Sequence, residues 1–225
     1  MITDYSIQAV AIQAIPLIFA ITIHEAAHGY AARLLGDNTA YVLGRVTLNP
    51  MKHIDPVGTI LIPLMLILLG SPFLIGYAKP VPVRFDRLKK PKIDMIWVAL
   101  AGPGANFAQG LIWAILLTLL LGFGIDEKFL TAMAVAGIQW NVGLLVFNLF
   151  PLPPLDGGRV LAGLLPYRQS IALGKIEPYG FFIVLALAYA GIIGNLWMRP
   201  LGDFFLWIIN LLTIPIQIIF GIHLL

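Results

Sequence analysis

The chain has 225 residues but no cysteine and few charged side chains. Without cysteine it can form neither a disulfide nor a thiolate metal site, so a metal ion would have to be held by His, Asp or Glu. Charged residues make up 11% of the chain, whereas soluble domains contain about 25%. Hydrophobic residues make up 60%. This composition excludes an ordinary soluble protein and leaves little sequence for a separate soluble domain.

The chain also lacks a strong excess of charge of either sign. Its net charge is +3, and its basic residues cluster where membrane orientation would place them, so we expect no nucleic-acid partner. Residues 1–6 contain no basic residue to begin a signal peptide. We therefore interpret the first apolar stretch as part of the mature protein.

Long apolar runs are what the chain has in abundance. A helix needs about 20 apolar residues to cross a bilayer, and five stretches are candidates for such spans: residues 7–35, 93–123, 131–150, 180–197 and 204–224. A sixth apolar stretch, 57–77, is interrupted by Pro63 and by Gly70-Ser71-Pro72. The sequence therefore predicts an all-α, multi-pass membrane protein with about five transmembrane helices.

The first of these stretches carries three costly polar residues. His24-Glu25-Ala26-Ala27-His28 has the H-E-x-x-H spacing. In that pattern two histidines, one helical turn apart, bind zinc and the glutamate acts as a general base. Ionisable residues inside a membrane helix are expensive and usually functional. The alternative is a set of buried polar residues bonded to neighbouring helices, at a cost of several kcal/mol without a metal.

A catalytic zinc site needs a third protein ligand. The remaining histidines are His53 and His223, and the better candidate is Asp156. It follows an apolar helix in a stretch rich in proline and glycine, where broken backbone can line a cavity at membrane depth. The alternative is an acidic residue in a simple turn. For His53 three roles remain open: a hydrogen bond to substrate, lining the site, and capping local structure.

Three motifs, in this order, resemble those of the site-2 protease family of intramembrane zinc metalloproteases. They are H-E-A-A-H at 24–28, A-G-P-G-A-N at 101–106, and N-L-F-P at 148–151 followed by L-D-G at 155–157. The resemblance covers roughly residues 7–165. It implies zinc held by His24, His28 and Asp156, with Glu25 as the catalytic base. The compact length and the stretch 77–83 resemble a prokaryotic branch without PDZ or CBS domains.

The resemblance also suggests roles for two asparagines. Asn148 is similar to a family asparagine that contacts substrate or the oxyanion, and a structural hydrogen bond between helices is the alternative. Asn106, like His53, is a candidate for binding substrate or lining the site, although its alternative role in helix packing is the more common one. The implied partners are a transmembrane protein substrate and the lipid bilayer.

The two halves of the zinc site must meet, and this constrains the topology. The helices over 7–35 and 131–150 must run in the same direction, with 93–123 returning between them. We therefore expect 57–77 to form a re-entrant hairpin, turning near 70–72. The basic loop 78–92 places the site towards the cytoplasmic face of a prokaryotic cell membrane, with the N-terminus outside. The stretches 41–48 and 76–83 are expected to form short membrane-associated strands whose edge could hold an unwound substrate.

The sequence thus predicts one integral-membrane peptidase domain over 1–225, with a catalytic core at about 7–165 and accessory helices at about 171–225. The expected activity is endopeptidase cleavage within or near transmembrane segments. Three alternatives remain: a transporter for ions or metals that uses the same polar residues, a catalytically inactive binding protein, and a metalloprotease whose third ligand is Glu127 or Glu177. The transporter is disfavoured by the absence of a visible inverted repeat, and the last by the lack of a helical ligand pattern around either glutamate.

Overall fold

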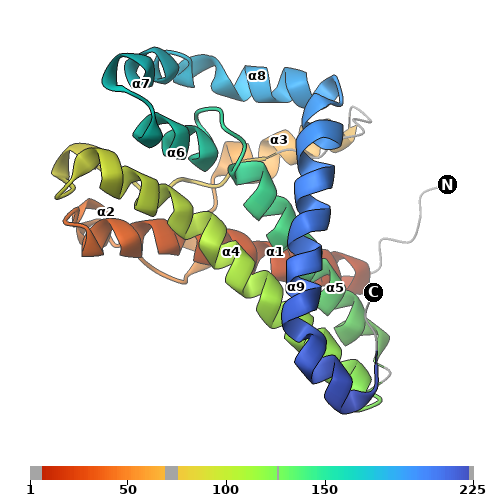
Figure 1. The fold of residues 1–225 in the computed structure, drawn as a ribbon. Coiled ribbons are helices and arrows are strands. Elements are labelled where there is room, and N and C mark those ends of the chain that lie inside the picture. The colour runs from red at the N-terminus through yellow and green to blue at the C-terminus, as the bar shows by residue number, and fades with distance from the viewer. Residues whose placement is uncertain (1–6, 69–75, 126, 223–225) are drawn as a thin grey trace.

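The computed structural model describes residues 7–68, 76–125 and 127–222. Helices dominate this part of the chain (Figure 1). The α-helices are α1 (Ile7–Leu34), α2 (Thr39–Val42), α3 (Ile62–Leu68), α4 (Pro91–Gly122), α5 (Lys128–Asn148), α6 (Asp156–Leu164), α7 (Tyr167–Gly174), α8 (Glu177–Tyr189) and α9 (Arg199–Phe220). The 3₁₀ turns are Pro50–Lys52 and Phe85–Arg87, and the π-helical turns are Pro56–Leu61 and Gly194–Met198.

Within the described residues, four helices are long and apolar enough to cross a membrane. They are α1, α4, α5 and the continuous helix Gly194–Phe220, which includes α9. A fifth span exists if α7 and α8, bent by 69° at their junction, count as one. The protein is therefore a multi-pass integral membrane protein. The expected straight span over 180–197 is wrong, because α8 ends at Tyr189 and Gly191, at φ 72°, turns the chain into the next helix.

Helix α4 is the centre of the bundle and packs against α1, α5, α6 and α9. It runs antiparallel to α1, since His28 contacts Val98 while His24 contacts Asn106. It also runs antiparallel to α5. Helices α1 and α5 consequently run in the same direction, as a shared site at their ends requires.

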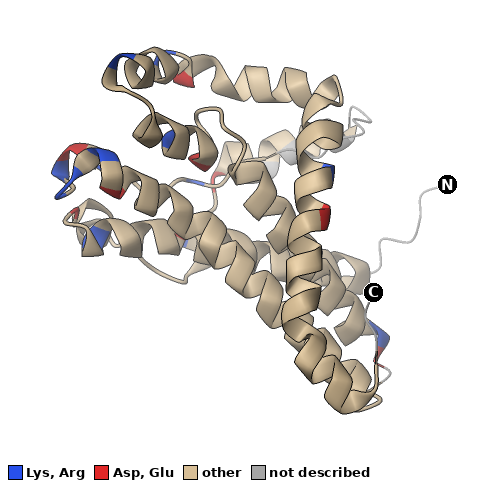
Figure 2. Cartoon of the chain, in the orientation of Figure 1, with Lys and Arg blue, Asp and Glu red and all other residues tan. Residues whose placement is uncertain are grey.

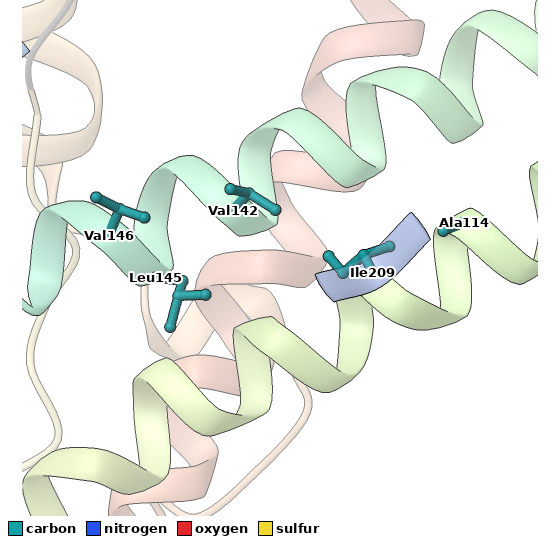
Figure 3. Close-up of a cluster of buried hydrophobic side chains, with 5 residues drawn as sticks. All are labelled: Ala114, Val142, Leu145, Val146 and Ile209. Atoms are coloured by element: carbon teal, nitrogen blue, oxygen red, sulfur yellow. The ribbon is translucent and has the colours of Figure 1, made fainter. Parts of the chain in front are cut away.

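A small apolar core fixes α9 against α4 and α5 (Figure 3). Ala114 of α4, Val142, Leu145 and Val146 of α5, and Ile209 of α9 are all almost completely buried. Small and branched side chains here allow close helix contact, which in a membrane depends on packing more than on the hydrophobic effect. This core holds α5 in place, and the loop after α5 leads to the site.

The charged residues gather mainly at one end of the bundle (Figure 2). They lie around the C-terminal end of α1, the N-terminal end of α4, and α6 and α7, while the middle of the long helices is almost free of charge. This distribution agrees with helices whose central turns face lipid and whose ends face water.

The prediction of short strands is not met in the described part of the chain, where no residue is in a strand. Residues 41–48 instead begin in α2. The Asp37 carboxylate accepts the Thr39 amide, which starts the helical turn, and Gly44, at φ 63°, ends it. This local hydrogen bonding outweighs the β-propensity of the sequence.

The other expected strand, 76–83, is an irregular segment packed on the protein. Pro80 and Pro82 have no amide hydrogen, so they cannot contribute to a ladder. The Tyr77 and Lys79 amides donate to the carbonyls of Gly58 and His53. The contact between Gly58 and Tyr77 brings the two ends of 57–77 together, as a hairpin requires, and its expected turn at 70–72 lies outside the described residues.

Candidate metal centre

His24 and His28 lie one turn apart on α1, and both are more than 90% buried. Their Nε2 atoms are 3.0 Å from each other. A helix places residues i and i+4 on the same face, so the H-E-x-x-H spacing alone brings the two imidazoles together. Both rings point towards α4, where Gly102 leaves room for them. A Cβ atom at Gly102 would lie 2.4 Å from Nε2 of His28 and 2.6 Å from Nε2 of His24.

Asp156 supplies a carboxylate at the same point. It is the first residue of α6, and its Oδ2 lies 3.2 Å from the Nε2 atom of each histidine. The loop 149–155 turns sharply enough to reach this position only because Gly157 and Gly158 have no side chains. A Cβ at Gly157 would lie 2.1 Å from the Leu149 carbonyl oxygen. The Gly-Gly pair thus explains how the broken helix end brings Asp156 back to α1.

The protonation of the two imidazoles follows from their other contacts. Nδ1 of His28 lies 2.7 Å from the carbonyl of Val98, which can only accept, so this nitrogen is the donor. Asn106 directs its Nδ2 to the Ala20 carbonyl and its Oδ1 to Nδ1 of His24, at 2.6 Å. Nδ1 of His24 is therefore also a donor. In the neutral rings, both Nε2 atoms then carry lone pairs that face Asp156.

Two lone pairs and a carboxylate oxygen repel one another unless they share a cation. The three ligand atoms lie within 4.8 Å of one another. A proton can be shared by only two of these atoms, whereas a tetrahedral metal accepts all three. The donor set thus fits a zinc ion with an open fourth position.

Asn106 and a second asparagine support His24 from behind. Nδ2 of Asn106 also donates to Oδ1 of Asn141, at 3.0 Å, and Asn141 donates in turn to the Gly137 carbonyl. Both asparagines are fully buried. Asn106 therefore contacts the His24 ring, and Asn141 is its buried partner, which the sequence interpretation missed. Its signal was present, because a polar residue in the apolar stretch of α5 is costly unless it has partners.

Glu25 faces open space beside the histidines. It lines two cavities, of about 280 Å³ and about 110 Å³, together with His24 and Asn148. Its Oε2 accepts the backbone amide of Val81 at 2.8 Å. This bond holds one carboxylate oxygen in place at the edge of both cavities, where a general base would be needed.

The remaining candidates are placed differently. Asn148, the last residue of α5, lines both cavities and donates to the Leu144 carbonyl one turn earlier. His53 is buried in the loop, where its Nε2 lies 2.9 Å from the Thr47 carbonyl and its own carbonyl accepts the Lys79 amide. Among the described residues that line these two cavities, His53 does not occur.

A paired H-E-x-x-H, a carboxylate third ligand and a bundle of membrane-length helices together define a membrane metallohydrolase. The family model for "Peptidase family M50" matches residues 12–138, which include both histidines and Asn106. The chain belongs to this family, the site-2 protease family, and is a zinc metalloprotease.

Relatives by sequence carry the same description. A Bacillus subtilis strain 168 protein, provisionally named zinc metalloprotease YwhC, is 40% identical over 86% of this chain and 83% of its own length. A Mycolicibacterium smegmatis protein, provisionally named zinc metalloprotease Rip2, is 32% identical over 76% of this chain. The alignment spans 63% of that Rip2 protein and 63% of the Mycobacterium tuberculosis H37Rv Rip2, which is 29% identical. No solved structure matches the chain.

Proposed function

We propose that this protein is an intramembrane endopeptidase that hydrolyses peptide bonds within or near transmembrane segments of membrane-protein substrates. The observation that carries the proposal is the position of the centre. His24, Glu25 and His28 lie on a span-length apolar helix, and Asp156 reaches them from the end of the segment that follows a second such helix. A substrate must therefore bring its peptide bond to the bundle at membrane depth.

Each residue of the centre has a distinct proposed role. His24, His28 and Asp156 hold the zinc ion, which when bound supplies Lewis acidity towards water and the substrate carbonyl. Glu25 accepts a proton from the attacking water and passes it to the leaving amine. Asn148, at the junction of the two cavities, donates from its amide to the developing oxyanion, a contact that is worth about 3 kcal/mol in other hydrolases.

The other proposed roles are structural. Asn106 positions the His24 ring through the 2.6 Å contact at Nδ1. His53 supports the segment 76–83 by accepting the Lys79 amide. We also propose that 7–165 is the catalytic core and that the helices over 171–225 are accessory, because every residue assigned to the centre precedes Leu165.

We propose that the centre lies towards the cytoplasmic side of a prokaryotic cell membrane. The support is the positive-inside rule, applied to the basic residues that follow α1 and precede α4 (Figure 2). Reporter fusions after Asn49 and after Lys90 should both give cytoplasmic signals. Signals from opposite sides of the membrane would refute the topology.

The activity is tested with purified protein reconstituted in lipid with a model transmembrane substrate. Glu25→Gln should abolish cleavage and retain zinc, because the ligands are unchanged. The matched control is Glu127→Gln, since Glu127 is an exposed residue at the N-terminus of α5. A zinc chelator should abolish cleavage by the wild type, and zinc should restore it. Full cleavage by the Glu25→Gln protein would refute the proposed base, whereas zinc flux without proteolysis would favour a transporter.

A further inference from the structure

Two cavities of opposite character meet at the candidate centre. His24, Glu25 and Asn148 line both of them. A peptide bond held at Glu25 would therefore border both cavities. The residues that line the far part of each cavity then determine which side chains can flank the scissile bond.

The larger cavity, of about 280 Å³, is mainly apolar beyond the three shared residues, with Thr59 and Tyr77 as the exceptions that carry a hydroxyl group. Leu17 and Ile21 of α1 and Leu144 and Phe147 of α5 contribute to its wall. All four precede the centre along parallel helices, so this cavity extends towards the middle of the bundle. An apolar wall of this size suits a bulky aliphatic or aromatic side chain.

The smaller cavity, of about 110 Å³, contains a positive charge. Arg159, one turn after Asp156 on α6, is part of its lining. The guanidinium donates no hydrogen bond to any residue that the structure describes. Its nearest carboxylate oxygen, Oε1 of Glu177, is 3.9 Å away, and the Arg159 and Glu177 side chains are 34% and 52% exposed. The face of the guanidinium lies 5.3 Å from the Phe85 ring.

The N–H groups of the Arg159 guanidinium are therefore available to a ligand. A partly exposed ion pair at 3.9 Å contributes little energy, whereas guanidinium binds a carboxylate through two parallel hydrogen bonds. Among the residues that line this cavity, Glu25 and Asp156 carry two negative charges, which a bound zinc ion would balance, so Arg159 is left as the unbalanced charge of the lining. Glu177 does not line the cavity. The cavity thus attracts an anionic group and repels a cationic one.

We propose that the enzyme selects peptide bonds that join a bulky apolar residue to an acidic one at the edge of a transmembrane segment. The apolar side chain occupies the larger cavity, and the acidic side chain pairs with Arg159. This inference rests on the proposed function and names its substrate class. Most membrane proteins carry Lys or Arg at their cytoplasmic edge. Arg159 would repel these positively charged segments. The enzyme would thus exclude the most common kind of transmembrane segment.

The test uses reconstituted zinc enzyme and one model segment whose first polar flanking residue is Glu, Gln or Lys. Wild type should cleave the Glu substrate roughly tenfold more efficiently than the Lys substrate, as expected for a partly exposed charge contact. Arg159→Gln should bring this ratio close to one, and Arg159→Lys should keep most of it. Arg168→Gln is the control, because it removes the same charge from an exposed residue of α7.

Binding of the same three segments to Glu25→Gln protein in nanodiscs gives a second readout that needs no hydrolysis. The Glu segment should bind tightest, and adding Arg159→Gln should remove the difference. An unchanged Glu-to-Lys ratio in the Arg159→Gln enzyme, or an equal loss on all three substrates, would overturn the inference. If the wild type binds the segments in the expected order but cleaves none, the proposed function fails and the inferred recognition stands.

Discussion

The backbone amide of Val81 donates a 2.8 Å hydrogen bond to Oε2 of Glu25, joining the loop before α4 to the candidate base on α1. Hydrogen bonds to charged groups contribute about 1.5–3 kcal/mol. This contact fixes the direction in which the carboxylate faces the two cavities. Because it comes from the main chain, a side-chain substitution that keeps the amide should leave it intact.

Replacing Val81 with proline removes that donor. We expect kcat/KM on a model substrate to fall by about 10-fold or more, which corresponds to the loss of one hydrogen bond to a charged group. Zinc content should stay the same, since neither imidazole nor Asp156 contacts Val81 in the hydrogen bonds described. The measurements are steady-state cleavage and zinc stoichiometry.

Val81→Ala is the matched control, because it shortens the buried side chain and keeps the amide. If the proline and alanine variants lose the same activity, the hydrogen bond contributes nothing and packing explains the effect.

Asn106→Ala should weaken zinc binding. The substitution removes the acceptor at 2.6 Å from Nδ1 of His24, and the loss of such a supporting contact typically costs 10–100-fold in metal affinity. Competition with a chromogenic chelator measures the change. Asn195→Ala, on an exposed residue before α9, should bind zinc as the wild type does. Wild-type affinity in Asn106→Ala would mean that the His24 ring is oriented by packing alone.

Gly102→Ala tests the close contact between α4 and the two imidazoles. The new methyl group would lie 2.4 Å from Nε2 of His28, so one or both rings must move. We expect loss of both zinc binding and cleavage. The control is Gly104→Ala on the same helix, where a Cβ meets no atom within 4 Å. Both substitutions raise helix propensity equally. A difference in zinc binding between Gly102→Ala and Gly104→Ala would therefore come from displacement of the histidine ligands.

Much of this centre could be predicted from the sequence because local spacing sets part of the geometry. The H-E-x-x-H pattern places His24 and His28 on one helical face, and the Gly-Gly pair after Asp156 indicates a close approach of backbone. The relation between Asn106 and Asn141 could not be predicted. It depends on how α4 and α5 are rotated against each other, and all-apolar helices carry no periodicity that reveals this.

The errors in the predicted fold also have physical causes. The β-branched residues of 41–48 favour a strand, but the hydrogen bond from the Thr39 amide to the Asp37 carboxylate favours a helical turn there. The helix expected over 180–197 looks continuous in composition. The helix ends because Gly191 adopts a positive φ. Any glycine can adopt this conformation, so the sequence does not show at which glycine the packing requires a turn.

Asp37 itself provides a prediction about pH. Burial would raise the pKa of its carboxyl, but hydrogen bonds from Thr39 and from the Arg84 amide outweigh burial and lower it. A lowered pKa stabilises the folded state above the unfolded value of about 3.9, and that contribution is lost as pH falls through the folded pKa. Asp37→Asn should therefore lower the free energy of unfolding by about 2 kcal/mol near pH 7.

The difference in unfolding free energy between wild type and Asp37→Asn should shrink as the pH falls below about 3.9, because protonation of wild-type Asp37 removes the charge that accepts these hydrogen bonds. Thermal unfolding in detergent across this range measures it. Asp86→Asn is the control, since that residue is exposed and its main contact is the exposed side chain of Arg84. A deficit that does not change with pH would show that the Asp37 charge has no part in holding the loop.

The ligands of the metal centre come from α1 and from α6, which begins more than 120 residues later in the chain. During synthesis His24 and His28 enter the membrane early, whereas Asp156 emerges only after α4 and α5 have been made. A growing chain thus passes through insertion with an incomplete set of ligands. The three ligands are therefore complete only once α1, α4 and α5 have been made, so the order of the ligands in the chain delays proteolysis until these three spans are in place.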